Sequence, residues 1–141
     1  MEMPPCYYRV SVKALVTKND KVLLTRENNG KWDLLGGGLD FGESFEIGLK
    51  REIFEESGLK IKKMSNQPVY SWTYENINYE GFLRRYLILL FRVELDSENF
   101  LENFTPSDEC QELKFFSKEE LKSLHTSATL EKFKELFNPE I

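Results

Sequence analysis

The side chains best suited to chemistry lie between Gly36 and Leu59, in the stretch GGGLDFGESFEIGLKREIFEESGL. Its glutamates are Glu43, Glu46, Glu52, Glu55 and Glu56. Like charges four residues apart on a helix cost roughly 0.2–0.5 kcal/mol per pair, so a helix selected for stability alone would alternate them with lysines. The stretch therefore predicts either a solvated acidic face, which is common on surface helices, or a set of carboxylates that share a cation.

The helical positions of these glutamates distinguish the two interpretations. With about 100° of rotation per residue, Glu56 lies about 40° and Glu55 about 60° from Glu52, on opposite sides of it. The small and apolar arc of the helix, which includes Leu49 and Ile53, overlaps this acidic arc. We therefore expect the three carboxylates to point toward the protein body, where closely spaced, partly desolvated anions need a cation. Hard divalent cations prefer carboxylate oxygens, so the sequence predicts a Mg²⁺ or Mn²⁺ site.

The same stretch has defined residues at a fixed spacing, namely Gly37, Glu43, Arg51, Glu52, Ile53, Glu55, Glu56, Gly58 and Leu59. This spacing resembles the Nudix box, the signature of the Nudix hydrolase family, at every defined position. A chance match has a probability on the order of one in 10⁹ per starting position. The resemblance implies a fold of class α/β (α+β). The expected form is a Nudix-like α/β/α sandwich, in which a mixed β-sheet carries the box helix and the C-terminal helices.

The resemblance also implies an activity, the hydrolysis of a nucleoside diphosphate linked to another moiety X. It implies that Mg²⁺, with Mn²⁺ as a substitute, is held by Glu52, Glu55, Glu56 and a backbone carbonyl of the glycine run, that of Gly36. Arg51 is expected to pair with a glutamate of the box and hold it in position. A bound metal ion neutralises diphosphate oxygens and lowers the pKa of a bound water, whose proton a glutamate accepts.

Other carboxylates have roles by the same resemblance. Glu43 is expected to be a supporting carboxylate at the start of the helix, where the helix dipole favours an anion. Many family members take another glutamate, as base or extra metal ligand, from a loop near the last strand. In the segment SDECQELKFF the first choice is Glu109, the second is Glu112, and Asp108 is a third. The alternative is an ordinary polar loop.

Recognition of X is expected to involve aromatic rings, which stack on bases, and arginines, which bind phosphate. The predicted substrate-binding residues are Trp32, Tyr74 and Arg84. Further candidates in the same region are Trp72, Tyr79, Phe82 and Arg85. The alternative interpretation makes the aromatics part of a strand core and the arginines solvated edge residues.

One position departs from the common family form. Leu35 stands where that form has proline, which alters the entry into the glycine turn.

His125, the one histidine, lies between two expected helices and is not predicted to be catalytic. The marks of the ADP-ribose and coenzyme A subfamilies are absent, so the sequence does not identify X.

These side chains need a scaffold, and the apolar periodicity predicts one of mixed strands and helices. Strands are expected at Tyr7–Thr17, Val22–Glu27, Trp32–Leu35, Leu59–Met64, Val69–Tyr74, Phe82–Leu95 and Leu113–Phe116, the first two forming a hairpin and the sixth being centrally buried. Helices are expected at Glu43–Ser57, Ser117–Leu124 and Ser127–Phe137, and Asp96–Asp108 is expected to be a polar loop. Gly58 is predicted to end the first helix in the left-handed conformation. Ser117 with Glu120 is predicted to open the second as a capping box. The apolar stripe of the last helix is Leu130, Phe133, Leu136 and Phe137.

Length and composition bound the remaining possibilities. The 141 residues, 40% hydrophobic, predict one domain spanning residues 1–141. A net charge of −5 disfavours general nucleic-acid binding or a membrane-surface role. Cys6 and Cys110 form no paired motif, and MEMPPCYYR lacks the features of a signal peptide, so a cytoplasmic location is expected. The expected partner is a small-molecule nucleotide, with the protein a monomer or a homodimer.

Two other classes of function compete with the hydrolase prediction. One is a Nudix-fold nucleotide-binding or sensor domain without turnover, although such domains usually have a damaged box. The other is an interaction module that uses Ile47 and Phe54, which fall on the side of the first helix where solvent is expected. Contact of these two residues with another element or with a partner chain remains open.

Overall fold

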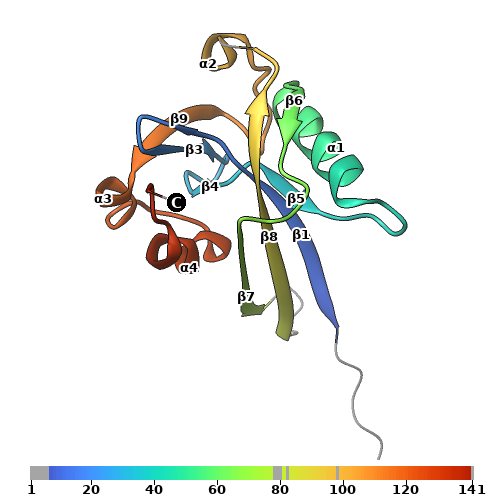
Figure 1. Ribbon diagram of the computed structural model, residues 1–141. Helices are drawn as coiled ribbons and strands as arrows, with labels where there is room; N and C mark the ends of the chain where they lie inside the picture. Colours follow the sequence, from blue (N-terminus) through green and yellow to red (C-terminus); the bar gives the residue numbers. More distant parts are fainter. Residues whose placement is uncertain (1–6, 78–80, 82, 98, 141) are drawn as a thin grey trace, which may run out of the picture.

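A long strand near the middle of the molecule, β8 (Leu83–Leu95), organises the larger of two sheets (Figure 1). The computed structural model describes residues 7–77, 81, 83–97 and 99–140. The strand order of this sheet is β5–β1–β8–β6, with β7 also paired to β8. Strand β1 (Tyr8–Leu15) is parallel to β8, whereas β5 (Gly36–Gly38), β6 (Ile61–Met64) and β7 (Tyr70–Ile77) are antiparallel to their partners. The prediction of a buried central strand is confirmed.

The smaller sheet contains β2 (Thr17–Lys18), β3 (Lys21–Arg26), β4 (Trp32–Asp33) and β9 (Glu112–Ser117). One extended segment passes from the larger sheet to the smaller between β1 and β2. The turn after β2 has positive φ at both central residues, 51° and 63°, as tight hairpins require. The predicted hairpin is therefore shorter than expected, because most of its first arm pairs with β5 and β8 instead of β3.

Helix α1 (Phe45–Ser57) carries the acidic motif and lies along one side of the larger sheet (Figure 1). It begins two residues later than predicted, because Ser44 is its N-cap and accepts a hydrogen bond from the Ile47 backbone. Gly58 ends the helix with a φ of 71°, as predicted. Ile47 and Phe54 are exposed, so their predicted position on the solvent side is confirmed.

The remaining helices are short. α2 (Phe100–Asn103) lies in the segment Asp96–Asp108, which was predicted to be a polar loop. That prediction is therefore wrong in part. α3 (Lys118–Leu121) has the predicted capping box, in which the Ser117 and Glu120 side chains each accept from the other's backbone. α4 (Ala128–Leu136) packs against β7. Its predicted apolar stripe is confirmed except at Leu136, which is 37% exposed.

Two hydrophobic cores lie on the two faces of the larger sheet. Val12 and Phe91 belong to the first core, which includes Leu49 and Ile53 of α1. The second core joins the other face of the sheet to the smaller sheet and to α3 and α4. The predicted layered arrangement, a mixed sheet with the box helix on one side and the C-terminal helices on the other, is confirmed. Within the described ranges no helix has the length and apolarity needed to cross a membrane.

Candidate active site

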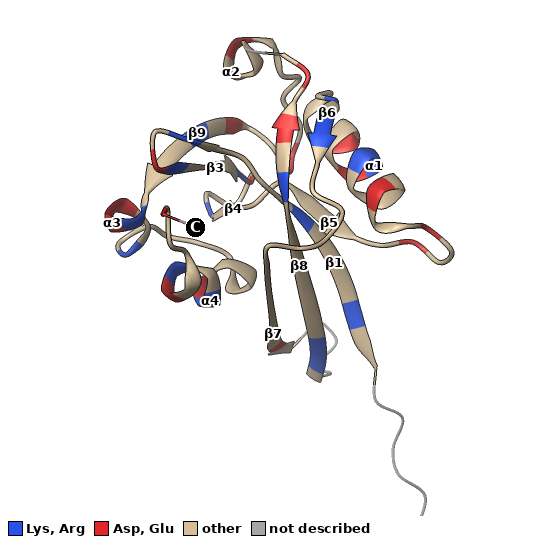
Figure 2. Cartoon of the chain, viewed as in Figure 1, with Lys and Arg blue, Asp and Glu red and all other residues tan. Residues whose placement is uncertain are grey.

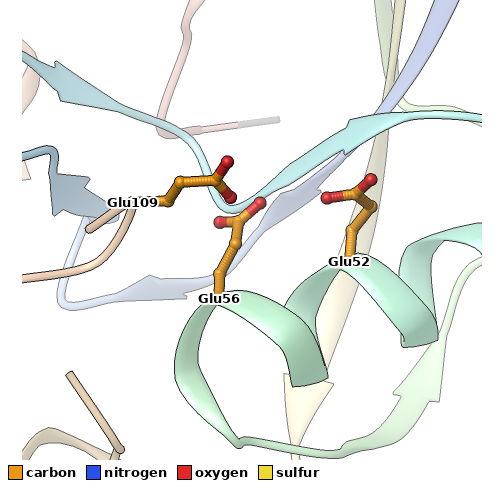
Figure 3. Close-up of side chains that lie close together, drawn as sticks. All are labelled: Glu52, Glu56 and Glu109. Carbon is orange, nitrogen blue, oxygen red and sulfur yellow. The ribbon is translucent and has the colours of Figure 1, made fainter. Parts of the chain in front are cut away.

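Three glutamates converge on one point beside strand β5 (Figure 3). Glu52 and Glu56 project from successive turns of α1, and Glu109 reaches them from the loop before β9. One carboxylate oxygen of each residue lies within 4.8 Å of the other two. Ligands on opposite sides of one Mg²⁺ are about 4 Å apart, so this spacing is close to that of a shared cation. Three oxygen donors of this hardness suit Mg²⁺ or Mn²⁺.

Glu56 is the most enclosed member of the cluster, with a relative exposure of 4%. Burial raises the pKa of this carboxyl well above its usual value, the nearby Lys13 lowers it, and Glu109 and Glu52 raise it further. The Gly36 backbone N–H donates to Glu56 Oε2 at 3.5 Å. The ionised form of Glu56 is therefore costly until a cation joins the cluster.

The loop that carries Glu109 is tied to both sides of the site. Ser107 Oγ donates to the Glu56 carbonyl at 2.6 Å, at the end of α1. Thr25 Oγ1, on strand β3, donates to the Glu109 carbonyl at 3.1 Å. These bonds hold the loop between α1 and the smaller sheet, so Glu109 is fixed beside the two glutamates of the helix.

Arg51 links the start of α1 to the cluster. Its Nε and Nη2 donate to the two carboxylate oxygens of Glu43 at 2.7 and 2.8 Å. Its Nη1 donates to Glu52 Oε1 at 2.9 Å and to Glu55 Oε2 at 3.2 Å. Hydrogen bonds from Arg51 lower the pKa of Glu43 to about 2, and the same contact raises the pKa of Arg51. Arg51 thus fixes the orientation of Glu52, the contact expected for it from the sequence.

The glycines of β5 leave room for the carboxylates. A Cβ at Gly37 would lie 2.6 Å from Glu52 Oε2, so the Glu52 carboxylate occupies the space of a side chain there. Gly36 has a φ of 126°, and a Cβ there would lie 2.2 Å from the Val12 carbonyl oxygen. Gly36 therefore requires glycine because of its backbone, whereas a side chain at Gly37 would displace the Glu52 carboxylate.

The glutamates face a cavity of about 480 Å³ that Glu27 and Asp108 also line. A larger cavity, about 850 Å³, lies near β6 and α2, and of its described lining residues Glu94 alone is acidic. The convergence of three carboxylates places the candidate site in the smaller cavity.

Other predicted metal-site residues have contacts that differ from those expected. The Glu55 side chain is 57% exposed and pairs with Arg51, so the inward orientation expected for it is wrong; its role as a ligand stays a prediction. The Gly36 carbonyl accepts from Lys13 Nζ at 3.2 Å, and its role as a metal ligand likewise stays a prediction. Glu112 lies on β9 opposite Arg26, outside the cluster.

The predicted substrate-binding residues do not line this cavity. Trp32 is half-buried, and its ring meets Phe116 edge-on at 4.8 Å. The Tyr74 hydroxyl lies 2.8 Å from Thr129 Oγ1. Arg84 is exposed. Their assignments stay predictions, and Tyr79, Phe82 and Cys6 lie outside the described residues.

Other predicted residues have contacts within the fold. The Tyr74 ring stacks on Tyr86 at 4.7 Å, and Trp72 is buried, with its indole N–H donating to the Thr129 carbonyl. Arg85 pairs with Glu75 at 2.9 Å.

Sequence reasoning missed Lys13, a buried lysine behind the glycine strand. Its signal is the alternation of Arg9, Ser11 and Lys13, polar residues on one face of a strand that is otherwise apolar. Burial tends to lower the pKa of Lys13, but the neighbouring Asp33 and Glu56 carboxylates outweigh burial and raise it.

Comparisons with known proteins find related sequences. The NUDIX domain family model matches residues 7–137. A MutT-like protein of Streptomyces ambofaciens is 37% identical over 75 residues, which are 52% of this chain and 49% of that protein. The NAD-capped RNA hydrolase NudC of Actinobacillus succinogenes is 31% identical over 108 residues, which are 67% of this chain and 41% of that protein. The chain thus spans less than half the length of these curated relatives.

Solved structures share the fold. The MutT protein of Methanosarcina mazei superposes with a TM-score of 0.68 at 26% identity, covering 94% of each chain. The MutT NUDIX hydrolase of Burkholderia pseudomallei gives a TM-score of 0.70 at 20% identity, covering 94% of this chain and 99% of that one.

Proposed function

The chain belongs to the NUDIX domain family, and we propose that it hydrolyses a nucleoside diphosphate linked to a further moiety X, with a divalent cation held by the clustered glutamates. The observation that carries this proposal is the convergence of Glu52, Glu56 and Glu109, with oxygens within 4.8 Å of one another, beside a strand of glycines. In an ordinary acidic face on a surface helix, the carboxylates are exposed and come from the helix alone. Here one carboxylate is buried and a third comes from a loop distant in sequence.

The donor set fits Mg²⁺, with Mn²⁺ as a substitute, because carboxylate oxygens are the ligands that hard divalent cations prefer. Glu52 and Glu56 would hold the ion, and the Glu109 carboxylate lies beside them. When bound, such an ion neutralises diphosphate oxygens and acidifies a coordinated water. Glu109 is exposed and lies on a loop, so we assign to its carboxylate the acceptance of the water proton. Arg51 keeps Glu52 oriented by donating a hydrogen bond to its Oε1.

The substrate class is a small nucleotide with a diphosphate bond. The relatives named NAD-capped RNA hydrolases support a nucleotide substrate without fixing X. The net charge of −5 argues against tight binding of long nucleic acids, whose affinity depends on lysine and arginine contacts with phosphates. Lysines and arginines are spread over several elements, β1, β6, β8 and α4 among them, instead of following one strand or helix (Figure 2).

A hydrolysis screen tests the proposal. The panel contains nucleoside triphosphates, including oxidised guanine forms, nucleotide sugars, ADP-ribose, dinucleoside polyphosphates and coenzyme A, each with Mg²⁺ or Mn²⁺. The Glu56→Gln variant removes one carboxylate of the cluster, and Glu46→Gln is its matched control. Glu46 lies on the same helix but is exposed and pairs with Lys50.

We expect one preferred substrate and a loss of at least about 100-fold in Glu56→Gln, because even indirect partners of metal ligands are worth 10–100-fold. Glu46→Gln should keep wild-type turnover. Undiminished turnover in Glu56→Gln would contradict the site assignment. Metal-dependent nucleotide binding without turnover in the wild-type protein would instead support the sensor alternative.

The position of the third carboxylate has its own test. Glu109→Gln should lose at least about 10-fold in turnover, and Glu112→Gln, on the same segment but outside the cluster, should lose less than 2-fold. The reverse order would move the third carboxylate to Glu112.

A further inference from the structure

A buried lysine lies where the sheet meets the glycine turn. Strand β1 is flanked by β5 and β8, and Lys13 within it has a relative exposure of 8%. An ammonium group in such a place is costly unless it is paired and fully hydrogen-bonded. The position therefore needs an explanation beyond packing, and the contacts of the amine supply one.

The amine of Lys13 binds three oxygens of one short segment. Nζ donates to Asp33 Oδ2 at 3.4 Å, to the Leu34 carbonyl at 3.2 Å and to the Gly36 carbonyl at 3.2 Å. These three acceptors match the three donors of an ammonium group. Asp33 is buried as well, and its Oδ1 accepts from the Leu34 backbone at 2.7 Å. Lys13 and Asp33 together hold the backbone of residues 33–36, which we call the glycine-entry turn.

This turn leads directly into the candidate site. Gly36, its last residue, donates its N–H to Glu56 Oε2 and offers its carbonyl to Lys13. The next residue, Gly37, lies against the Glu52 carboxylate. A shift of the turn would therefore move the contacts of two of the three clustered glutamates. Leu35 lies inside the turn, at the position where proline would restrict the backbone, so rigidity here must come from other contacts.

We propose that Lys13 is a positioning residue, whose buried amine holds the glycine-entry turn so that Gly36, Glu52 and Glu56 keep the arrangement that binds the divalent cation. The inference rests on the proposed function. A positioning role for Lys13 differs from that of an ordinary structural ion pair. A structural pair would stabilise the folded protein but would not change its metal affinity.

The test removes both charges together. Lys13→Met alone would strand the Asp33 carboxylate in the interior, so the variant of choice is Lys13→Met combined with Asp33→Asn, which nearly conserves volume. The matched control is Lys134→Met. Lys134 also has a largely covered side chain, 13% exposed, and its amine donates to the Leu124 carbonyl and pairs with Glu131, on α4.

Mn²⁺ affinity is measured directly, from the electron paramagnetic resonance signal of free Mn²⁺. Hydrogen exchange at the Gly36 and Gly37 amides reports the order of the turn, and melting temperature reports folding. We expect Mn²⁺ to bind about 10–100-fold more weakly in the double variant, with faster exchange at the two amides. Turnover should recover as Mn²⁺ is raised, with the substrate KM at saturating Mn²⁺ within about 2-fold of wild type. Lys134→Met should change none of these quantities except melting temperature.

Unchanged Mn²⁺ affinity in a folded double variant would overturn the inference and leave the proposed function intact. A wild-type protein that binds no Mn²⁺ would overturn the proposed function, and the positioning role with it. Melting temperature separates both results from misfolding. If the double variant is unfolded, Lys13→Arg, which keeps a cation beside Asp33 but replaces the ammonium group that fits the three acceptors, must lower Mn²⁺ affinity at least about 10-fold; unchanged affinity would contradict the role given to the lysine.

Discussion

Replacing Glu56 by glutamine should have opposite effects on stability with and without metal. In the metal-free protein, burial disfavours the ionised Glu56 carboxylate, and Glu109 and Glu52 disfavour it further. The folded protein holds the pKa of Glu56 above the usual 4.5. Folding stability therefore falls as pH rises from about 4.5 to the raised pKa, because Glu56 ionises more readily in the unfolded chain. Above the raised pKa the loss of stability is constant. Glutamine has no such penalty. Metal-free Glu56→Gln should therefore melt higher than metal-free wild type at pH 8, and the gap should close near pH 4.

A bound cation reverses this order. A ligand at 100 times its Kd stabilises the folded state by about 2.7 kcal/mol. For a chain of 141 residues, each kcal/mol shifts the melting temperature by about 3–4 °C, so saturating metal should raise the wild-type value by about 9 °C. The variant has lost one of three clustered carboxylates and should gain less than about 3 °C at the same metal concentration.

The assay is a set of thermal melts in EDTA and in Mn²⁺, at pH 4, 6 and 8, with Glu46→Gln as the control. The control should respond to Mn²⁺ like the wild type. An equal response to Mn²⁺ in Glu56→Gln and wild type would refute the assignment of Glu56 as a ligand. A metal-free variant less stable than wild type at pH 8 would refute the argument that the cluster is strained without a cation.

Three other substitutions test separate parts of the site and scaffold. Gly37→Ala puts a methyl group where the Glu52 carboxylate lies, so Mn²⁺ affinity should fall at least about 10-fold in a calorimetric titration. The melting temperature should change little, because the end of the Glu52 side chain can move aside. Arg51→Lys should lower kcat by about 10–100-fold in steady-state kinetics, because an ammonium group cannot replace the planar fork of guanidinium donors; wild-type kcat would contradict the bridging role. Ser117→Ala, which removes a helix cap far from the carboxylates, should cost about 1 kcal/mol of unfolding free energy in a urea titration and leave turnover intact.

Local periodicity predicted part of the acidic face of α1. Glu52 and Glu56 are four residues apart, and both turn toward the cluster. Glu55 was expected beside them, yet it points to solvent and pairs with Arg51 across one helical turn. The helix lies beside β5, the edge strand of its sheet, so a narrower arc is covered than the apolar pattern suggests. The width of a buried arc depends on what packs against a helix, and one helix's sequence does not contain that information.

Long-range pairing explains the other differences. A turn with hairpin signals predicts that the strands on either side pair with each other, and only β2 and β3 do so. Strand β1 instead lies between β8 and β5, and its pairing with β5 places Lys13 opposite Gly36, where its amine also pairs with Asp33. The alternation of Arg9, Ser11 and Lys13 marked a polar face on β1, but only the tertiary structure shows that the glycine-entry turn covers it.

The parallel pairing of β1 with β8 also has a consequence for the order in which the protein folds. Tyr8 pairs with Arg85, 77 residues further along the chain, so β1 is synthesised well before its partner strand. Pairings of such high contact order form slowly, because the loop must close before its contacts can stabilise it. A nascent chain that ends before Leu83 contains α1 and its glutamates but has no central strand against which to place them. Glu109 is synthesised later still, so the proposed cation site can form only after β8 and the loop before β9 have been made.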